Sequence, residues 1–304
     1  MTKRDFLTVD ALSSDELVKV LDIADELKAD RRRRDDLAGK SIGMIFEKPS
    51  TRTRVSFEVG IAELGGHPVI LNASELQLGR GETVEDTARV LSRYLHALVV
   101  RTFAQPRLET LAAAGSIPVI NALSDFTHPC QALADMQTIR EHRGSLAGLK
   151  LAYLGDGNNV AHSLLKAGAM AGMRVTVATP AGYEPIPQVV EAATEIADRT
   201  GGAVTCTTDP LEAAADADVI YTDVWASMGQ EGEASARTML FRPFQVNGHV
   251  MDAARPDALV MHCLPAHRDE EISADVIDGP NSVVFDQAEN RLHSQKALLL
   301  FLLT

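Results

Sequence analysis

The alternation of short apolar runs with helical patterns is the feature that most constrains the fold of this chain. Along most of the sequence, an apolar run is followed by a segment with apolar residues at helical spacing. Strands that alternate with helices form a parallel sheet covered on both faces. We therefore expect an α/β protein with doubly wound parallel sheets. The expected strands are 40–46, 68–71, 97–100, 118–121, 149–154, 174–178, 203–205, 219–222, 259–262 and 283–285.

The length of the chain points to two domains. At 304 residues it exceeds what one hydrophobic core usually supports. A short polar stretch with two glycines, 143–148, interrupts the alternation, which then begins again. We therefore expect a first domain of residues 1–143 and a second of residues 144–287.

Composition excludes several classes of protein. A net charge of −13 argues against a general nucleic-acid binder. No apolar stretch approaches the roughly 20 residues of a membrane span, and residues 1–10 lack the apolar run of a signal peptide, so we expect a cytoplasmic protein without membrane contact. Cys130, Cys206 and Cys263 show neither a disulfide framework nor zinc-ligand spacing, so no metal is expected.

One polar cluster lies between an expected strand and an expected helix, in the run Ser50-Thr51-Arg52-Thr53-Arg54. Backbone N–H groups at a helix N-terminus attract anions, and the hydroxyl groups add further donors. Arg52 adds a planar fork that can hold a phosphate with two hydrogen bonds. Taken alone, the cluster is equally typical of an ordinary helix N-cap beside surface arginines.

This run resembles the carbamoyl-phosphate signature of the aspartate and ornithine carbamoyltransferases. Three more motifs follow in the family's order: Arg101 after the strand 97–100, then His128-Pro129-Cys130-Gln131, then His262-Cys263-Leu264-Pro265 of the ornithine branch. The resemblance covers essentially the whole chain. It implies transfer of the carbamoyl group of carbamoyl phosphate to the side-chain amine of L-ornithine. The products that it implies are citrulline and phosphate, in arginine biosynthesis or, reversed, in arginine catabolism.

The resemblance also implies roles for individual residues. Attack by the amine builds negative charge on the carbonyl oxygen and the leaving phosphate, so preformed donors there lower the barrier. Arg101 and His128 are the expected catalytic donors, and Cys263 is expected to position the amine without a covalent intermediate. Gln131 would accept from the carbamoyl NH2 group. The residues implied for carbamoyl phosphate are Ser50, Thr51, Arg52, Thr53, Gln77, Arg101, His128, Pro129, Cys130, Gln131 and Arg291.

A second group of residues selects the acceptor. Asp223 ends an expected strand and would pair with the α-ammonium of ornithine. The following Ser227-Met228-Gly229 resembles the family's mobile loop, and Asn159 with the backbone of Met228 would bind the α-carboxylate. Residues 223–233 contain no lysine or arginine, which favours ornithine over the second carboxylate of aspartate. The residues implied for ornithine are Asn159, Asp223, Ser227, Met228, Cys263 and Leu264.

Two positions of the resemblance concern assembly. Gln77 matches a residue that reaches carbamoyl phosphate from a neighbouring subunit, which implies a homotrimer, or a multiple of trimers, with shared active sites. Arg291 matches a late arginine near the carbamoyl group, so the last helix, 288–304, should return to the first domain. No cofactor is implied.

Other functions stay open from the residues alone. Gly155-Asp156-Gly157-Asn158-Asn159-Val160 follows a strand and resembles the fingerprint of an NAD(P)-dependent dehydrogenase. It lacks the third glycine, and the strand 174–178 ends in Thr179-Pro180 where an acid would bind the ribose. A non-catalytic binding protein on the same fold is disfavoured by the intact motifs. Putrescine or an acylated ornithine remains an alternative acceptor, because one loop decides this specificity.

Overall fold

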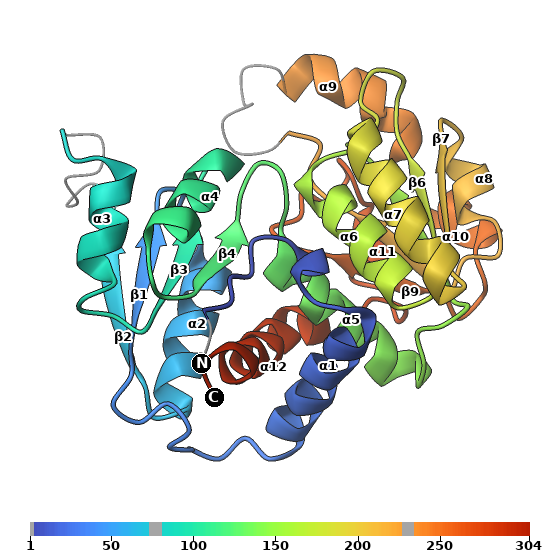
Figure 1. Ribbon diagram of the computed structural model, residues 1–304. Coiled ribbons are helices and arrows are strands. Elements are labelled where there is room, and N and C mark those ends of the chain that lie inside the picture. The colour runs from blue at the N-terminus through green and yellow to red at the C-terminus, as the bar shows by residue number, and fades with distance from the viewer. Residues whose placement is uncertain (1–2, 73–80, 227–233) are drawn as a thin grey trace. The chain divides into compact units, whose positions relative to one another are not determined.

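The computed structural model describes residues 3–72, 81–226 and 234–304, and it divides into two compact units (Figure 1). The first unit comprises Met1–Ala134 with Glu289–Thr304, and the second comprises Asp135–Ala288. Helix α5 (Pro129–Arg143) begins in the first unit and ends in the second. The contact division therefore falls inside α5, whereas the sequence places the boundary after this helix.

The first unit is built on a four-stranded parallel sheet with the strand order β2-β1-β3-β4. All five residues of β3 are buried, as expected of a strand covered on both faces. The strands are β1 (Ser41–Phe46), β2 (His67–Asn72), β3 (Ala97–Arg101) and β4 (Val119–Leu123). The helices before α5 are α1 (Ser14–Ala29), α2 (Thr51–Glu63), α3 (Val84–Leu91) and α4 (Gln105–Ala114), with a 3-10 turn at Val9–Ala11.

The second unit is built on a five-stranded parallel sheet with the order β7-β6-β5-β8-β9. Its central strands are buried, and β7 forms a largely exposed edge. The strands are β5 (Lys150–Leu154), β6 (Arg174–Ala178), β7 (Ala203–Thr207), β8 (Val219–Thr222) and β9 (Leu259–His262). The helices are α6 (Asn159–Met170), α7 (Pro187–Thr200), α8 (Pro210–Ala214), α9 (Ala234–Phe241), α10 (Gly248–Ala253) and α11 (Ala274–Ile277), with a 3-10 turn at Arg242–Phe244.

Each sheet has a switch point, where later strands are added on the opposite side of the first strand. In the first unit, β2 extends the sheet to one side of β1 while β3 and β4 extend it to the other. In the second unit, β6 and β7 lie to one side of β5 while β8 and β9 lie to the other. Ligands of open parallel sheets bind at the carboxyl ends of the strands at such switch points. The fold therefore marks one candidate site in each unit.

The C-terminal helix α12 (Val284–Leu303) returns to the first unit, as expected. Lys28 of α1 donates to Asn290 (2.9 Å), and Lys296 pairs with Glu63 of α2 (2.8 Å). These contacts attach α12, at Asn290 in its first half and at Lys296 in its second half, to α1 and α2. The helix thus brings its own polar residues, including Arg291, into the first unit.

The expected strand at 283–285 is wrong. Val283 donates one backbone hydrogen bond to Val260 of β9 (3.0 Å), and Ser282 forms an isolated bridge to the same residue. The chain then turns directly into α12 at Val284, leaving Phe285 exposed on its first turn. Three apolar residues in a row are compatible with a strand or with the start of a helix, and here the helix prevails. The other expected strands occur as β1 to β9.

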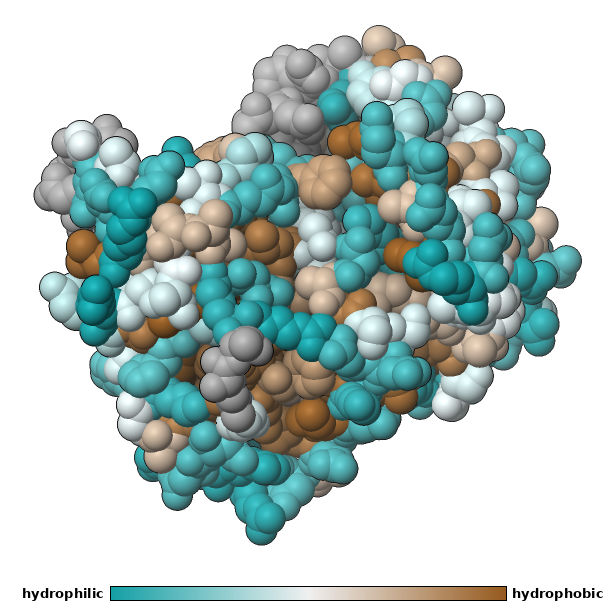
Figure 2. Space-filling view, in the orientation of Figure 1, coloured by the Kyte–Doolittle hydropathy of each residue, from teal (hydrophilic) through white to brown (hydrophobic). Residues whose placement is uncertain are grey.

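The surface is mixed in polarity. On the face shown in Figure 2, hydrophilic residues alternate with smaller hydrophobic areas. Within residues 3–72, 81–226 and 234–304, no helix combines the length and the apolar character needed to cross a membrane.

Candidate functional site

The polar cluster after β1 forms the N-terminus of α2. Ser50 is the N-cap residue, and its hydroxyl accepts a hydrogen bond from the N–H of Thr53 (3.3 Å). The helix begins at Thr51, and the N–H groups of the first turn of an α-helix point outward along its axis. Thr53 is buried, and Arg52 is half-buried. This end of α2 therefore has the donors and the partial positive charge that suit an anion.

Arg101 lies at the same switch point because β1 and β3 are neighbours. It is the last residue of β3 and is paired in register with Phe46, the last residue of β1. The N–H of Glu47 donates to the carbonyl of Arg101 (2.9 Å), which holds the two strand ends together. Parallel pairing thus sets Arg101 beside the segment that leads into α2.

Arg291 joins this group from the other end of the sequence. Its Nη1 donates to Oε1 of Gln131 (2.6 Å), and its Nη2 donates to Oγ1 of Thr53 (3.0 Å). All three side chains are buried. Helix α12 therefore connects the N-terminus of α2 with the first turn of α5, where Gln131 lies.

The positive charges of three arginines act on the imidazole of His128. Burial, followed by the positive charges of Arg291, Arg101 and Arg52, holds the pKa of His128 well below its ordinary value. His128 is therefore neutral at physiological pH, beside a concentration of positive charge in an otherwise acidic protein. A dianion bound among these guanidinium groups would relieve their mutual repulsion.

Cys130 contributes differently. Burial raises the pKa of its thiol to about 12, so the group is a neutral thiol and not a nucleophile. Its Sγ donates to the backbone carbonyl of Asn121 in the middle of β4 (3.3 Å). Any contact of this residue with a ligand would come from its backbone.

The neutral state of His128 predicts a pH dependence of stability. In the unfolded chain an ordinary histidine takes up a proton below about pH 6.5, whereas the folded protein keeps His128 neutral. The unfolded state then binds more protons, so the free energy of unfolding falls as the pH falls, by up to about 1.4 kcal/mol per pH unit for this group. When the free energy of unfolding is measured with urea between pH 7.5 and 5.5, it should change less with pH in His128→Gln than in the wild type.

The matched control is His249→Gln, at an exposed position on α10. It should retain the wild-type dependence on pH. An unchanged slope in His128→Gln would show that His128 is not held neutral in the folded protein.

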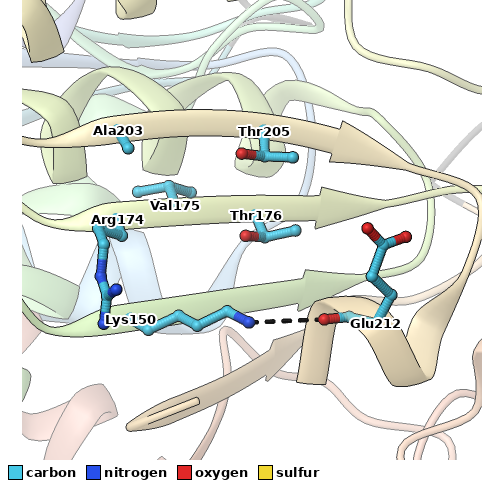
Figure 3. A pocket seen from close by; sticks show the side chains of 7 residues that line it. All are labelled: Lys150, Arg174, Val175, Thr176, Ala203, Thr205 and Glu212. Carbon is cyan, nitrogen blue, oxygen red and sulfur yellow. Dashed lines mark hydrogen bonds between the residues drawn. The ribbon is translucent and has the colours of Figure 1, made fainter. Parts of the chain in front are cut away.

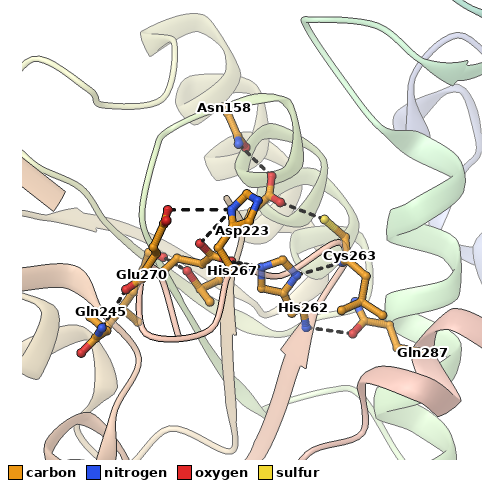
Figure 4. Close-up of polar contacts among 12 residues, drawn as sticks. Asn158, Asp223, Gln245, His262, Cys263, His267, Glu270 and Gln287 are labelled. Carbon is orange, nitrogen blue, oxygen red and sulfur yellow. Dashed lines mark hydrogen bonds and ion pairs between the residues drawn. The ribbon is translucent and has the colours of Figure 1, made fainter. Parts of the chain in front are cut away.

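The second unit brings Asp223 and Cys263 together at its own switch point. The two residues directly follow β8 and β9, whose last residues Thr222 and His262 are paired in register. The Sγ of Cys263 donates to Oδ1 of Asp223 (3.0 Å), and Nδ2 of Asn158 donates to Oδ2 (3.0 Å) (Figure 4). Asn158 follows β5, the strand on the other side of β8. Three strand ends thus converge on one buried carboxylate.

A buried histidine and glutamate hold the backbone that follows Cys263. Nδ1 of His262 accepts from the N–H of Leu264 (2.8 Å), so the ring proton is on Nε2, which faces Oε1 of Glu271 (3.2 Å). Burial alone would raise the pKa of Glu271, but hydrogen bonds from His262 and the His267 N–H lower it. The ionised Glu271 fixes the ring, and the ring fixes Leu264, which has a left-handed backbone conformation (φ 57°).

This cluster is a poor metal site. The ligand atoms of Asp223, His262 and Cys263 lie within 4.8 Å of one another. Both ring nitrogens of His262 are, however, engaged, with Leu264 and Glu271. The remaining two ligands are fewer than the three that catalytic zinc sites use. A second set, His267, Glu270 and Glu271, shares Glu271 with the same network.

A pocket of about 350 Å³ elsewhere on the second unit does not coincide with these residues (Figure 3). Lys150 and Arg174 in its lining are the first residues of β5 and β6, at the end of the sheet opposite the switch-point residues. The ammonium of Lys150 donates to the carbonyls of Ala215 (2.7 Å) and Glu212 (3.5 Å) and so caps the C-terminus of α8. Lys150 is therefore explained by its role in the fold.

Comparison with known proteins assigns the chain to a family. Residues 4–141 match the model of the carbamoyl-P binding domain of aspartate/ornithine carbamoyltransferases, and residues 147–302 match that of their Asp/Orn binding domain. The chain is 66% identical to ornithine carbamoyltransferase of Parafrankia sp. over 307 aligned residues, covering 100% of this chain and 97% of the relative. The chain belongs to the ornithine carbamoyltransferase family.

Solved structures of ornithine carbamoyltransferases agree with this. The enzyme of Pyrococcus furiosus superimposes with a TM-score of 0.97 at 55% identity, covering 99% of this chain and 97% of that one. The enzyme of Gloeobacter violaceus gives a TM-score of 0.90 at 49% identity, covering 99% of both chains. The two expected substrate-binding domains of the family are thus both present.

The fingerprint of a dinucleotide-binding loop has another explanation in this family member. Oδ1 of Asn158 accepts from the N–H groups of Val160 (2.9 Å) and Ala161 (3.2 Å), and so caps α6 with its own side chain. Asp156 adds a carboxylate that pairs with Arg237 (2.7 Å). A pyrophosphate would meet a helix N-terminus that Asn158 already caps and a carboxylate that Arg237 already pairs with.

The structure groups most of the expected residues and adds others. Gln77, Ser227 and Met228 lie outside the described residues. Asn159 is the first residue of α6, and its neighbour Asn158 donates a hydrogen bond to Asp223. From the sequence, Asn158 and His262 were named only as members of the runs 155–160 and 262–265, without a role at the site, and Glu271 was not named. The N-cap preference for asparagine could have indicated Asn158, whereas the contact between His262 and Glu271 had no such signal.

Proposed function

We propose that this chain forms citrulline by direct transfer, with carbamoyl phosphate bound at the switch point of the first unit. The hydrogen bonds by which Arg291 joins Thr53 at the N-terminus of α2 to Gln131 on α5 are the observation that carries this proposal, and the charges of Arg52, Arg101 and Arg291 act there on His128. The phosphate binds at the N-terminus of α2 and accepts hydrogen bonds from Ser50, Thr51, Arg52 and Thr53. Three cations match the charge of a bound phosphate dianion and the negative charge that develops during its departure.

The remaining hydrogen-bond donors bind the carbonyl end of carbamoyl phosphate. Arg101, His128 and Thr53 stabilise the oxygen that becomes negative in the tetrahedral intermediate. Oε1 of Gln131 already accepts from Arg291, and the second lone pair of this oxygen can accept from the carbamoyl NH2 group. Pro129 and Cys130 contribute through the backbone of the first turn of α5.

The second unit supplies the acceptor site. The buried carboxylate of Asp223 pairs with the α-ammonium of ornithine, and Cys263, hydrogen-bonded to it, helps to position the reacting amine. Leu264, whose backbone is fixed by His262, lines the same end. Asn159, Ser227 and Met228 complete the proposed contacts, with the α-carboxylate as their partner. The amine itself is the nucleophile, so the transfer needs no acyl-enzyme.

We also infer a homotrimer with shared active sites, in which Gln77 of a neighbouring subunit contacts carbamoyl phosphate. The support is the match of the sequence around Gln77 to this family. Sedimentation equilibrium should then give a mass of about three times, or a multiple of three times, the 32.7 kDa of one chain. A monomer or dimer would contradict the inference.

The acceptor is tested by supplying saturating carbamoyl phosphate with one amine at a time and assaying the carbamoylated product. L-Ornithine should be carbamoylated at least about 100-fold more efficiently than putrescine, Nα-acetylornithine or L-aspartate. Putrescine lacks the α-carboxylate, Nα-acetylornithine lacks the ammonium that Asp223 pairs with, and L-aspartate lacks the side-chain amine. Equal or greater efficiency with any of these would overturn the assignment of the acceptor.

A further inference from the structure

Gln295 closes a ring of hydrogen bonds around Arg291. Its side-chain oxygen accepts from both Nε and Nη2 of Arg291, at 3.0 Å each, and its side-chain nitrogen donates to Oγ of Ser56 (2.6 Å). Ser56 donates in turn to the carbonyl of Thr53 (3.2 Å), while Nη2 of Arg291 donates to Oγ1 of Thr53 (3.0 Å). The ring thus joins two residues of α12 to two residues of α2.

The spacing of the four residues explains why the ring forms. Gln295 lies four positions after Arg291 on α12, and Ser56 lies three positions after Thr53 on α2. Residues at these separations share one face of a helix, so the two pairs face each other where α2 and α12 meet. Gln295 and Arg291 are buried there, away from water that could replace the bonds.

The direction of every hydrogen bond in the ring is determined. A guanidinium carries only N–H donors, so the oxygen of Gln295 must face Arg291 and its NH2 group must face Ser56. Ser56 then accepts from Gln295 and uses its single proton on the Thr53 carbonyl. A rotation of the Gln295 amide would set donors against the guanidinium, and this fixes the plane of Arg291.

We propose that Gln295, oriented by Ser56, is a positioning residue for Arg291 in the carbamoyl transfer. This inference rests on the proposed function, in which Gln131 and Thr53 contact carbamoyl phosphate. Arg291 bonds both of these side chains, at 2.6 Å and 3.0 Å. Gln295 therefore controls, through one guanidinium, the orientation of Gln131, which accepts from the carbamoyl NH2 group, and of Thr53, which binds the phosphate, without touching the substrate itself.

The test is a double-mutant cycle between Gln295→Met and Arg291→Ala. Methionine keeps the unbranched shape of glutamine and removes the acceptor. Gln295→Met should lower kcat/KM for carbamoyl phosphate about 10- to 100-fold, mostly through kcat, because a misaligned donor is lost in the transition state. The KM for ornithine should change less than about twofold, since the acceptor contacts are elsewhere.

The cycle separates positioning from a general loss of structure. In the Arg291→Ala background, Gln295→Met should have less than about a twofold further effect, because residues that act as a unit are not additive. Ser294→Ala, which removes a buried hydroxyl bonded to Asn290 on the same helix, should leave the kinetics unchanged. Should Gln295→Met fail to fold, Ser56→Ala replaces it in the cycle. Ser56→Ala should lower kcat/KM for carbamoyl phosphate by a smaller factor, and its effect should again be less than about twofold in the Arg291→Ala background.

Two failures are distinguishable. Equal losses from Gln295→Met in both backgrounds, or no loss at all, would overturn the positioning role while Arg291→Ala still impairs the enzyme. No effect of Arg291→Ala would instead overturn the role given to Arg291 in the proposed function.

Discussion

Replacing Arg52 by alanine is expected to lower kcat/KM for carbamoyl phosphate by a factor of about 100 to 1000. Arg52 stands on the first turn of α2, next to Thr53 and electrostatically coupled to His128. The substitution removes a planar, charge-assisted donor pair from the anion while leaving the helix cap Ser50 intact. Steady-state kinetics with carbamoyl phosphate as the varied substrate measure the loss.

Two further variants make this result specific. Arg52→Lys should recover only part of the activity, because an ammonium keeps the charge but not the fork. Arg54→Ala is the matched control. Side chains two positions apart on a helix point to different sides, and Arg54 is exposed with Glu58 as its ion-pair partner (3.8 Å). Equal losses in Arg52→Ala and Arg54→Ala, or none in either, would contradict the phosphate site.

The second large effect is expected at Asp223. Asp223→Asn keeps the size of the side chain and an oxygen for Asn158, but it removes the negative charge. The α-ammonium of ornithine then loses its charge partner in a buried site, and we expect acceptor binding to weaken about 100-fold. Binding of carbamoyl phosphate should stay within about threefold, because its contacts are in the first unit.

Calorimetry measures this effect without turnover. L-Norvaline keeps the α-amino and α-carboxylate groups of ornithine but lacks the reacting amine, so it can be titrated in the presence of saturating carbamoyl phosphate. Asp198→Asn, an exposed carboxylate on α7, serves as the control and should bind norvaline as the wild type does. Norvaline binding by Asp223→Asn that is as tight as in the wild type would contradict the assignment of Asp223 to the acceptor site.

The positions of the strand ends could be predicted from the sequence because the pattern of apolar runs is local. Arg101, Asp223 and Cys263 each stand at or directly after a buried strand, and parallel pairing then brings them to the switch points. The N-terminus of α1 follows an equally local rule, because Ser13 and Glu16 have the three-residue spacing of a capping box and form one. Motifs that depend on one strand or one helix end could therefore be predicted from the sequence.

Contacts between distant segments could not be predicted in this way. Nothing in the spacing of Ser56 and Gln295 indicates that α2 and α12 meet, nor that Glu271 reaches His262. The expected strand at 283–285 failed for a related reason. Three apolar residues satisfy either a strand or a buried helix start, and only the packing of Val284 and the turn after the bridge at Ser282 decide between them.

Direct transfer is tested most directly with carbamoyl phosphate labelled at its carbonyl carbon. The protein is incubated with the labelled compound alone, quenched and freed of small molecules, and a second sample receives L-ornithine before the quench. Direct attack predicts no label on the protein in the first sample, and labelled citrulline with an equal amount of phosphate in the second. Label retained on the protein in the absence of ornithine, at Cys263 or any other residue, would contradict it.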